Sequence, residues 1–384
     1  MRADMDARAR LGFYTANQKQ KALHMEPHTA DSIYKDFLAQ KSSMDHGSNV
    51  LRLAKKYKVE LEDITSLALV TYKVPDFNDR AKRAQLPPSQ HKPTAGLLLQ
   101  GCAQAEDPLA IVHILTAVYL NSTNAHGSIK EIARLFPPAE VAKYRKLLDT
   151  LTARANKISL GPDVLTLKGL FLEQEGQKEQ AIWLYQEAVQ RCHFKFTPGS
   201  RHPLQLPLIA PWNALGYLLK SDKVADVRSE AKTYFKKGAL EADDPLSYFE
   251  LAAFEPRTGT QWLQYTTKAA ASGHSEAIVN VATFYQDVAA SDPAILNHSP
   301  MRKALNWLLS WQPGSAAVLA REWLQAASMA GHKPSMLKLA DYYTSIGAHE
   351  RAKEYLRKML DPPLPTQHGE EWPQLVQVAR QRLR

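Results

Sequence analysis

Apolar residues in this chain recur every three or four positions, which is the spacing of one face of an α-helix. One arrangement occurs twice with the same internal spacing, a Gly-His pair followed by three residues of one helix face. The first copy is Gly273, His274, Ala277, Val281 and Tyr285, and the second is Gly331, His332, Ser335, Leu339 and Tyr343. Because one helix must end at each glycine and another must begin after it, the pattern predicts a repeated helical hairpin with glycine in a left-handed turn.

A further hairpin is predicted from residue 161 onward. Small residues allow its two helices to approach closely, and larger residues fill the groove between them. The small set is Gly169, Ala181 and Ala188, and the large set is Leu165, Leu172 and Tyr185. Gly176 is expected to turn the hairpin in the left-handed conformation. Together the patterns predict an all-α, right-handed helical-hairpin solenoid of about five hairpins, preceded by an N-terminal helical region.

The same patterns divide the chain into four parts. Residues 1–30 show no clear periodicity and are predicted to be a flexible arm, whereas residues 31–160 are predicted to be the N-terminal helical region. Residues 161–361 hold the repeat array. Residues 362–384 begin with prolines and continue as an amphipathic stretch, which is expected to be a helix that caps the last hairpin.

Capping residues and prolines mark the ends of the expected elements. Three side chains are predicted to cap helix starts: Asp31, Ser48 and Asp107. Prolines make residues 191–211 an extended loop, and they make residues 291–314 an insertion that holds a short helix over 301–311. His274 and His332 are expected to cap or hydrogen-bond the helix that follows each repeat turn.

Charge is distributed unevenly along the 384 residues, which carry a formal net charge of +9. Residues 1–160 contain 23 Lys and Arg against 16 Asp and Glu, so most of the basic excess lies outside the clearest repeats. The excess is compatible with RNA, with acidic protein partners or with an anionic membrane surface. The alternative interpretation is a basic compartment such as the mitochondrial matrix.

Composition places the chain among soluble intracellular proteins. It is 45% hydrophobic and 23% charged, and it has two cysteines, Cys102 and Cys192. Two distant cysteines favour a reducing compartment over a disulfide framework. No apolar run approaches the roughly 20 residues that a transmembrane helix needs, so no transmembrane segment is predicted. We expect a mitochondrial-matrix location in preference to the cytoplasm, although Asp4 and Asp6 fit a presequence poorly.

No constellation of catalytic residues is found, and the chain is predicted not to be an enzyme. Gly96 and Gly101 have the spacing of a phosphate loop but lack its lysine. Cys192, His193 and His202 lack a fourth ligand, so neither a metal nor another cofactor is predicted. Cys102 is interpreted as a packing residue. Tryptophans on helix faces are expected to lie mostly in the core: Trp183, Trp212, Trp262, Trp307, Trp311 and Trp323.

The best candidate site is the concave face of the predicted array. Core positions in the helix over 275–288 leave three polar residues that point away from the hairpin partner. They are Asn280, Thr283 and Asp287, and the matching residues of the last repeat are Lys338, Asp341 and Ser345. Such side chains would align as a polar stripe that grips an extended or helical peptide. A merely solvated stripe is the alternative interpretation.

A second candidate site is a basic cluster next to Tyr57. It consists of Arg52, Lys55, Lys56 and Lys58. Specific recognition of single-stranded RNA needs several stacking aromatic residues beside the charge, and only Tyr57 lies in the cluster. The cluster therefore predicts weak RNA binding at most, and a solvated helix face is the preferred interpretation.

Residues 161–360 resemble the SEL-one-like repeats, a longer-period relative of the tetratricopeptide repeat. In each copy, alanines precede the Gly-His turn, and Leu-Ala or Val-Ala and then Tyr follow it. The resemblance rests on this arrangement. Ala282 and Ala340 stand where the family usually has glycine. The resemblance implies a non-enzymatic scaffold or assembly factor that binds another protein on the concave face. An RNA-associated helical-repeat protein, possibly organellar, that uses the basic N-terminal region is the alternative. The sequence leaves the partner and the oligomeric state open.

Overall fold

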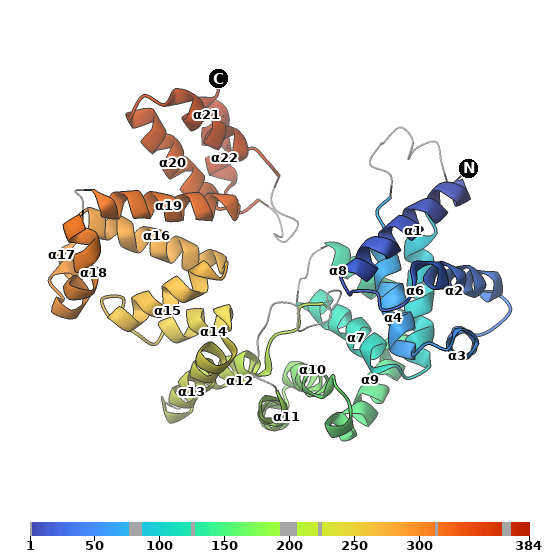
Figure 1. Cartoon of the computed structure of the whole chain (residues 1–384). Coiled ribbons are helices and arrows are strands. Elements are labelled where there is room, and N and C mark those ends of the chain that lie inside the picture. The colour runs from blue at the N-terminus through green and yellow to red at the C-terminus, as the bar shows by residue number, and fades with distance from the viewer. Residues whose placement is uncertain are drawn as a thin grey trace. The chain divides into compact units, whose positions relative to one another are not determined.

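The computed structural model describes residues 2–76, 87–123, 127–192, 206–221, 225–311, 314–362 and 370–384. Within these ranges all regular structure is helical and no strand occurs, as the all-α prediction required (Figure 1). The described residues form two compact units. Unit 1 comprises residues up to 192 together with 206–211, and unit 2 runs from residue 212 to residue 384.

Unit 1 contains the N-terminal helices and the first predicted hairpin. In it α4 packs against α6, α3 packs against α6, and α10 packs against α11. The helices are α1 (Arg2–Lys19), α2 (Pro27–Gln40), α3 (His46–Tyr57), α4 (Leu61–Tyr72), α6 (His91–Gln104), α7 (Pro108–Ser122), α8 (Gly127–Arg134), α9 (Pro138–Ala153), the 3-10 turn η1 (Ala155–Lys157), α10 (Gly161–Gln174) and α11 (Lys178–Arg191). The hairpin α10–α11, which the sequence pattern assigned to the repeat array, thus belongs to the same unit as the N-terminal helices.

The predicted flexible arm is instead a helix, α1, which packs against α2 and α4. Its buried Tyr14 shares a 2.7 Å hydrogen bond with the hydroxyl of Thr71 on α4. Its buried Arg10 forms a 2.8 Å ion pair with Asp31. Sequence periodicity missed this helix because its buried face is mostly polar, so no apolar repeat marks it.

Two of the three predicted helix caps were wrong. Asp31 lies inside α2, which begins at Pro27, and the Asp31 carboxylate is held by Arg10. The cap of α3 is Asp45, whose carboxylate accepts the Ser48 backbone N–H at 3.2 Å. The prediction for Asp107 is confirmed, because its carboxylate accepts the backbone N–H of Ala110 at 3.0 Å. The two errors have one cause: a helix begins where its backbone hydrogen bonds begin, which can be a turn before its apolar pattern does.

Unit 2 consists of consecutive helical hairpins that pack side by side, as in a helical solenoid (Figure 1). In it α14 packs against α15, α16 against α19 and α20 against α21. The helices are α12 (Pro211–Lys220), α13 (Ala225–Ala242), α14 (Pro245–Ala252), α15 (Thr260–Ala271), α16 (Ser275–Ala289), α17 (Pro293–Leu296), α18 (Ser299–Trp311), α19 (Ser315–Met329), α20 (Lys333–Ser345), α21 (His349–Lys358) and α22 (Pro373–Arg382). The expected insertion contains α17 and α18, which lie in the chain between the two packed helices α16 and α19.

The repeat turns have the predicted backbone conformation. Gly273 and Gly331 have φ values of +89° and +87°, and Gly176 has a φ of +80°. The prediction that Gly169 permits close approach is also confirmed, since a Cβ atom there would lie 2.4 Å from the Tyr185 ring. Glycine at these positions therefore sets both the turns and the distance between paired helices.

The predicted C-terminal cap is present. Helix α22 packs against α20 and α21, and its Val376 and Ala379 are buried. Ala379 joins the same hydrophobic core as Leu339 of α20 and Leu356 of α21. Helix α22 thus covers a face of the last hairpin that a further repeat would otherwise bury. Most of the predicted 191–211 loop, including His193 and His202, lies outside the described residues.

Candidate partner-binding surface

Polar side chains join the first helices of successive hairpins in unit 2. Lys220 of α12 forms a 2.6 Å ion pair with Glu250 of α14. Arg257, which follows α14, pairs with Asp287 of α16 at 2.5 Å. Two further links continue the row: Lys338 of α20 donates to Gln286 of α16 at 2.9 Å, and Arg382 of α22 pairs with Asp341 of α20. We call this set of residues the polar ladder: Lys220, Glu250, Arg257, Gln286, Asp287, Lys338, Asp341 and Arg382.

The six residues of the predicted stripe lie on α16 and α20, next to the polar ladder or within it. Asn280, Thr283 and Asp287 are half-buried, and spacing of three and four residues puts them on one face of α16. On α20 the corresponding trio is exposed: Lys338, Asp341 and Ser345. The Lys338–Gln286 bond brings the two trios together near the C-terminal end of α16.

Sequence reasoning did not foresee that half of the stripe is already bonded within the chain. Asp287, Lys338 and Asp341 each contact a side chain of a neighbouring element. The Ser345 hydroxyl donates locally to the Tyr342 carbonyl at 2.7 Å. No local sequence pattern reveals these contacts. The insertion over residues 291–314 separates Gln286 from Lys338, and Arg382 belongs to α22.

The exposed links of the polar ladder are weak enough to be exchanged for contacts with another molecule, whereas the Glu250 carboxylate of the Lys220–Glu250 pair is buried. Both members of the Arg257–Asp287 and Arg382–Asp341 pairs are about one third to one half exposed. Ion pairs at that exposure contribute only ~0–1 kcal/mol to stability because water screens them and long side chains lose entropy. A partner could therefore displace them at small cost to the fold.

Aromatic residues with cations over their rings lie close to this surface. Arg257 lies 5.8 Å from the centre of the half-buried Trp262 ring, and Arg321 lies 4.4 Å from that of Tyr342. The expectation that the tryptophans are mostly core holds for Trp212 but not for Trp183 or Trp307, which are 59% and 56% exposed. Helical spacing alone could not separate an inner face from an outer one there, because both faces of α11 and α18 carry apolar residues.

The two repeat histidines cap their helices, as predicted. Nδ1 of His274 accepts the Ala277 backbone N–H, and Nδ1 of His332 accepts that of Ser335, each at 3.3 Å. Burial lowers the pKa of both imidazoles, which favours the neutral ring that a cap requires. His274 also stacks on Phe249 with ring centres 4.2 Å apart.

The basic cluster of α3 is largely occupied with the fold. Lys56 and the Tyr57 hydroxyl both bond Asp36 of α2, at 2.5 and 2.8 Å. Arg52 donates to Asn49 at 2.9 Å. Lys55 and Lys58 are exposed. Such an arrangement fits a solvated helix face better than a site for phosphate, which needs several free cations.

In the described part of the chain, Cys102 is not placed to act as a nucleophile, and no cluster of metal-ligating side chains occurs. Cys102 is fully buried, and burial raises the pKa of its thiol, so the nucleophilic thiolate is disfavoured at neutral pH. Among the described residues, no group of three His, Cys, Asp or Glu could hold a metal ion. In the same part of the chain, no helix combines the length and hydropathy that crossing a membrane requires.

No protein-family model matches the sequence, and no curated protein matches it. The chain is similar to a solved Sel1 repeat protein from Oxalobacter formigenes, with 16% identity, coverage of 92% of this chain and 94% of that one, and a TM-score of 0.36. It is also similar to the c5321 protective antigen of uropathogenic Escherichia coli, which displays an SLR fold, with 13% identity, coverage of 90% and 70%, and a TM-score of 0.32. The Oxalobacter protein carries the type of repeat that the Gly-His turns of this chain resemble.

Proposed function

We propose that unit 2 is a non-enzymatic protein-interaction scaffold that binds an extended or helical segment of another protein across the polar ladder. The observation that carries the proposal is the row of donors and acceptors on consecutive first helices, in which the links between α16, α20, α22 and Arg257 are exposed enough to be replaced at little cost. Stacked hairpins present such rows along an extended surface, which suits a long peptide better than a small molecule.

The contact surface is proposed to include Asn280 and Thr283 of α16, beside the ladder residues Asp287, Lys338 and Asp341. Asn280 and Thr283 are half-buried, so an arginine placed there changes the surface a partner would meet. Changing the ladder residues would also remove contacts within the chain. Loss of binding could then not be distinguished from a change in the structure. Asn280 and Thr283 are therefore the better positions for a test.

The test compares two variants by affinity purification from the native cell with quantitative mass spectrometry. The double change Asn280→Arg and Thr283→Arg should remove the main co-purifying protein. The matched control is Gln264→Arg with Thr267→Arg, which puts the same charges at the same spacing on the second helix α15. A partner retained by both variants, with circular dichroism unchanged, would place the binding surface elsewhere in the chain.

The finer role of an assembly factor in the mitochondrial matrix is supported by the basic excess and by the SEL-one-like resemblance of the repeats. Its test is the location of the chain in fractionated cells. Protease protection within intact mitochondria supports this role, and recovery in the cytoplasm alone contradicts it.

A further inference from the structure

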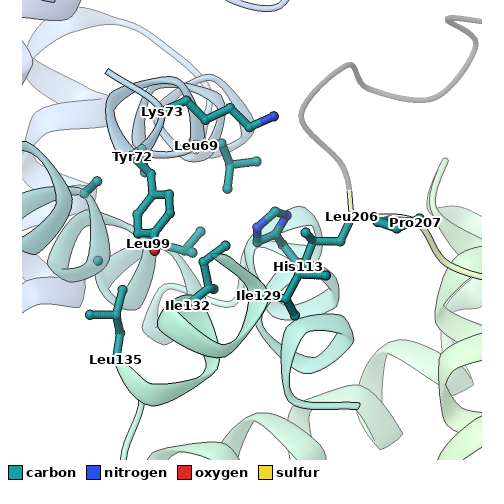
Figure 2. Close-up of a pocket in the computed structure, with 13 residues that line it drawn as sticks. Leu69, Tyr72, Lys73, Leu99, His113, Ile129, Ile132, Leu135, Leu206 and Pro207 are labelled. Carbon is teal, nitrogen blue, oxygen red and sulfur yellow. The ribbon is translucent and has the colours of Figure 1, made fainter. Parts of the chain in front are cut away.

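Unit 1 contains an apolar cavity of about 310 Å³ that the proposed scaffold does not use. Its wall is formed by α4, α6, α7 and α8 and by the segment before α12 (Figure 2). Most of the lining is aliphatic: Ala68, Leu69, Ala95, Leu99, Ile129, Ile132, Leu135 and Leu206. Cavities of roughly 300–1,000 Å³ with such linings are the usual form of small-molecule sites.

The cavity is lined by few polar side chains, and two of them also line a second, more polar cavity of about 550 Å³. Tyr72 and Lys73 belong to both linings. The second cavity adds Ser89, His91 and Lys92. The apolar cavity therefore adjoins one that is richer in polar groups, with Lys73 where they meet. An amphiphilic molecule, which has an apolar chain and a polar end, matches this arrangement.

The charged groups around the junction identify which end group would bind. Lys92 is bonded to Glu131 at 2.7 Å, and the Tyr72 hydroxyl donates to the same carboxylate at 3.4 Å. Asp76 forms a 2.8 Å ion pair with Arg2. Of the cations and carboxylates that line the two cavities in the described part of the chain, Lys73 is left without an ion pair.

An ammonium group in this position favours an anionic ligand. The Lys73 side chain is exposed, yet the protein around it replaces part of its water without supplying a carboxylate, and this desolvation lowers the pKa of its ammonium group. Figure 2 shows the Lys73 side chain beside the aliphatic wall formed by Leu69. A single ammonium matches a monoanionic carboxylate, whereas a phosphate group usually requires several donors or a bidentate arginine.

We propose that the cavity between α4, α6, α7 and α8 binds an alkyl carboxylate of medium chain length, with the chain among the aliphatic residues and the carboxylate on Lys73. Burial of the alkyl chain supplies the driving force, since affinity in such a site grows with the apolar area removed from water. Lys73 then gives preference for the acid over an uncharged end group. Leu206 and Pro207 cover one side of the cavity (Figure 2), which limits the length of the chain.

The proposal is tested by isothermal titration calorimetry of the full chain with decanoate and with decanol, both below their aggregation concentrations. Decanoate should bind saturably at one site, and decanol should bind about fivefold more weakly, the equivalent of the ~1 kcal/mol of a solvent-accessible ion pair. Lys73→Met should abolish this preference while leaving decanol binding unchanged. Lys55→Met, which removes the same charge from the exposed face of α3, should change neither affinity.

A second variant separates the cavity from the rest of the surface. Ile129 is only half-buried, so Ile129→Trp should fill the cavity without emptying a packed core, and it should abolish binding of both probes. Thermal unfolding of each variant shows whether the fold is kept. Absence of saturable decanoate binding overturns the proposal, and so does unchanged binding in a folded Ile129→Trp variant. Binding of a leucine-terminated peptide but not of decanoate overturns it in favour of a protein ligand.

Discussion

At the scale of single residues, the repeat turns depend on a glycine and a histidine with different tasks. Glycine ends one helix in a conformation that side chains disfavour, and histidine starts the next by accepting a backbone N–H. Both tasks could be predicted from the sequence, because each follows from the chemistry of one residue type. The pairing of Arg10 with Asp31 could not, since it depends on how distant segments meet.

Replacement of Gly273 by alanine should lower the free energy of unfolding by about 1–2 kcal/mol, the cost of a left-handed conformation for a residue with a Cβ atom. Its φ is +89°, and no atom beyond its two chain neighbours lies within 4 Å of the added Cβ, so the loss comes from the backbone alone. Gly12→Ala is the control, because Gly12 lies in the regular helix α1 with equal space around it. There the change should stabilise by up to ~1 kcal/mol. Urea unfolding measures both, and equal effects would contradict the turn assignment.

Protonation of the capping histidines should destabilise the repeats in mild acid. Burial lowers the pKa of His274 and His332 in the folded state, so the unfolded chain binds more protons as the pH falls below the ordinary histidine pKa of about 6.5. The free energy of unfolding therefore falls as the pH drops below the ordinary histidine pKa. It stops falling once the pH is below the folded-state pKa. Glu276, Glu250 and Asp244 oppose the shift at His274, and Lys338 adds to it at His332.

The measurement is the urea midpoint at pH 7.5 and at pH 5.5. A variant with His274→Asn and His332→Asn keeps a capping side chain that does not titrate, and its midpoint should change less between the two conditions. If the wild-type chain and this variant lose the same amount of stability, the acid sensitivity arises from other groups.

At the scale of elements, the sequence predicted the helices whose buried faces are apolar. It did not predict α1, whose buried face is mostly polar. The hairpins, the insertion helix and the C-terminal helix were predicted because apolar spacing marks their packed faces. Helix α1 was missed because Asp6, Arg10 and Asn17 lie on its buried side beside Tyr14. The stripe residues were placed on the right helices, but their bonds to Gln286, Arg257 and Arg382 depend on contacts between elements that no local pattern records.

The capping helix should protect the last hairpin selectively. Ala379→Arg puts a charge into the core that α22 shares with α20 and α21, and it should destabilise that end by at least ~2 kcal/mol. Hydrogen exchange should then show lost protection in α20 and α21, while α10 and α11 stay protected, because repeats depend mainly on their neighbours. Gln377→Arg adds the same charge at an exposed position of α22 and should leave exchange unchanged. Uniform loss throughout the chain would show that the units unfold together.

At the scale of the whole molecule, the chain combines a basic N-terminal half with a repeat unit whose charges are nearly balanced. The balance explains how a row of alternating donors and acceptors can form in unit 2 without repulsion. In unit 1 many cations are already paired with carboxylates, including Arg10 with Asp31, Lys56 with Asp36 and Lys168 with Asp149. The net charge therefore overstates how many cations are available to an outside ligand.

RNA binding should accordingly be weak and should disappear between low and physiological salt. Its affinity would come from released counterions, and that gain shrinks as the bulk salt concentration rises. Filter binding of a random-sequence RNA across a salt series measures the effect. Changing Lys55 and Lys58 to alanine should reduce the low-salt affinity slightly, because these two lysines of the basic cluster are exposed.

The remaining members of the basic cluster decide between RNA and a solvated helix face. Changing Lys56 alone should perturb its pair with Asp36 and therefore the packing of α2 on α3, so a structural loss must be separated from a binding loss. Circular dichroism of each variant makes that separation. Tight binding at physiological salt that falls when Arg52, Lys55, Lys56 and Lys58 all become alanine, in a folded chain, would favour an RNA-associated function over the scaffold. Retained tight binding in that fourfold variant would locate the RNA contact on other cations of the chain.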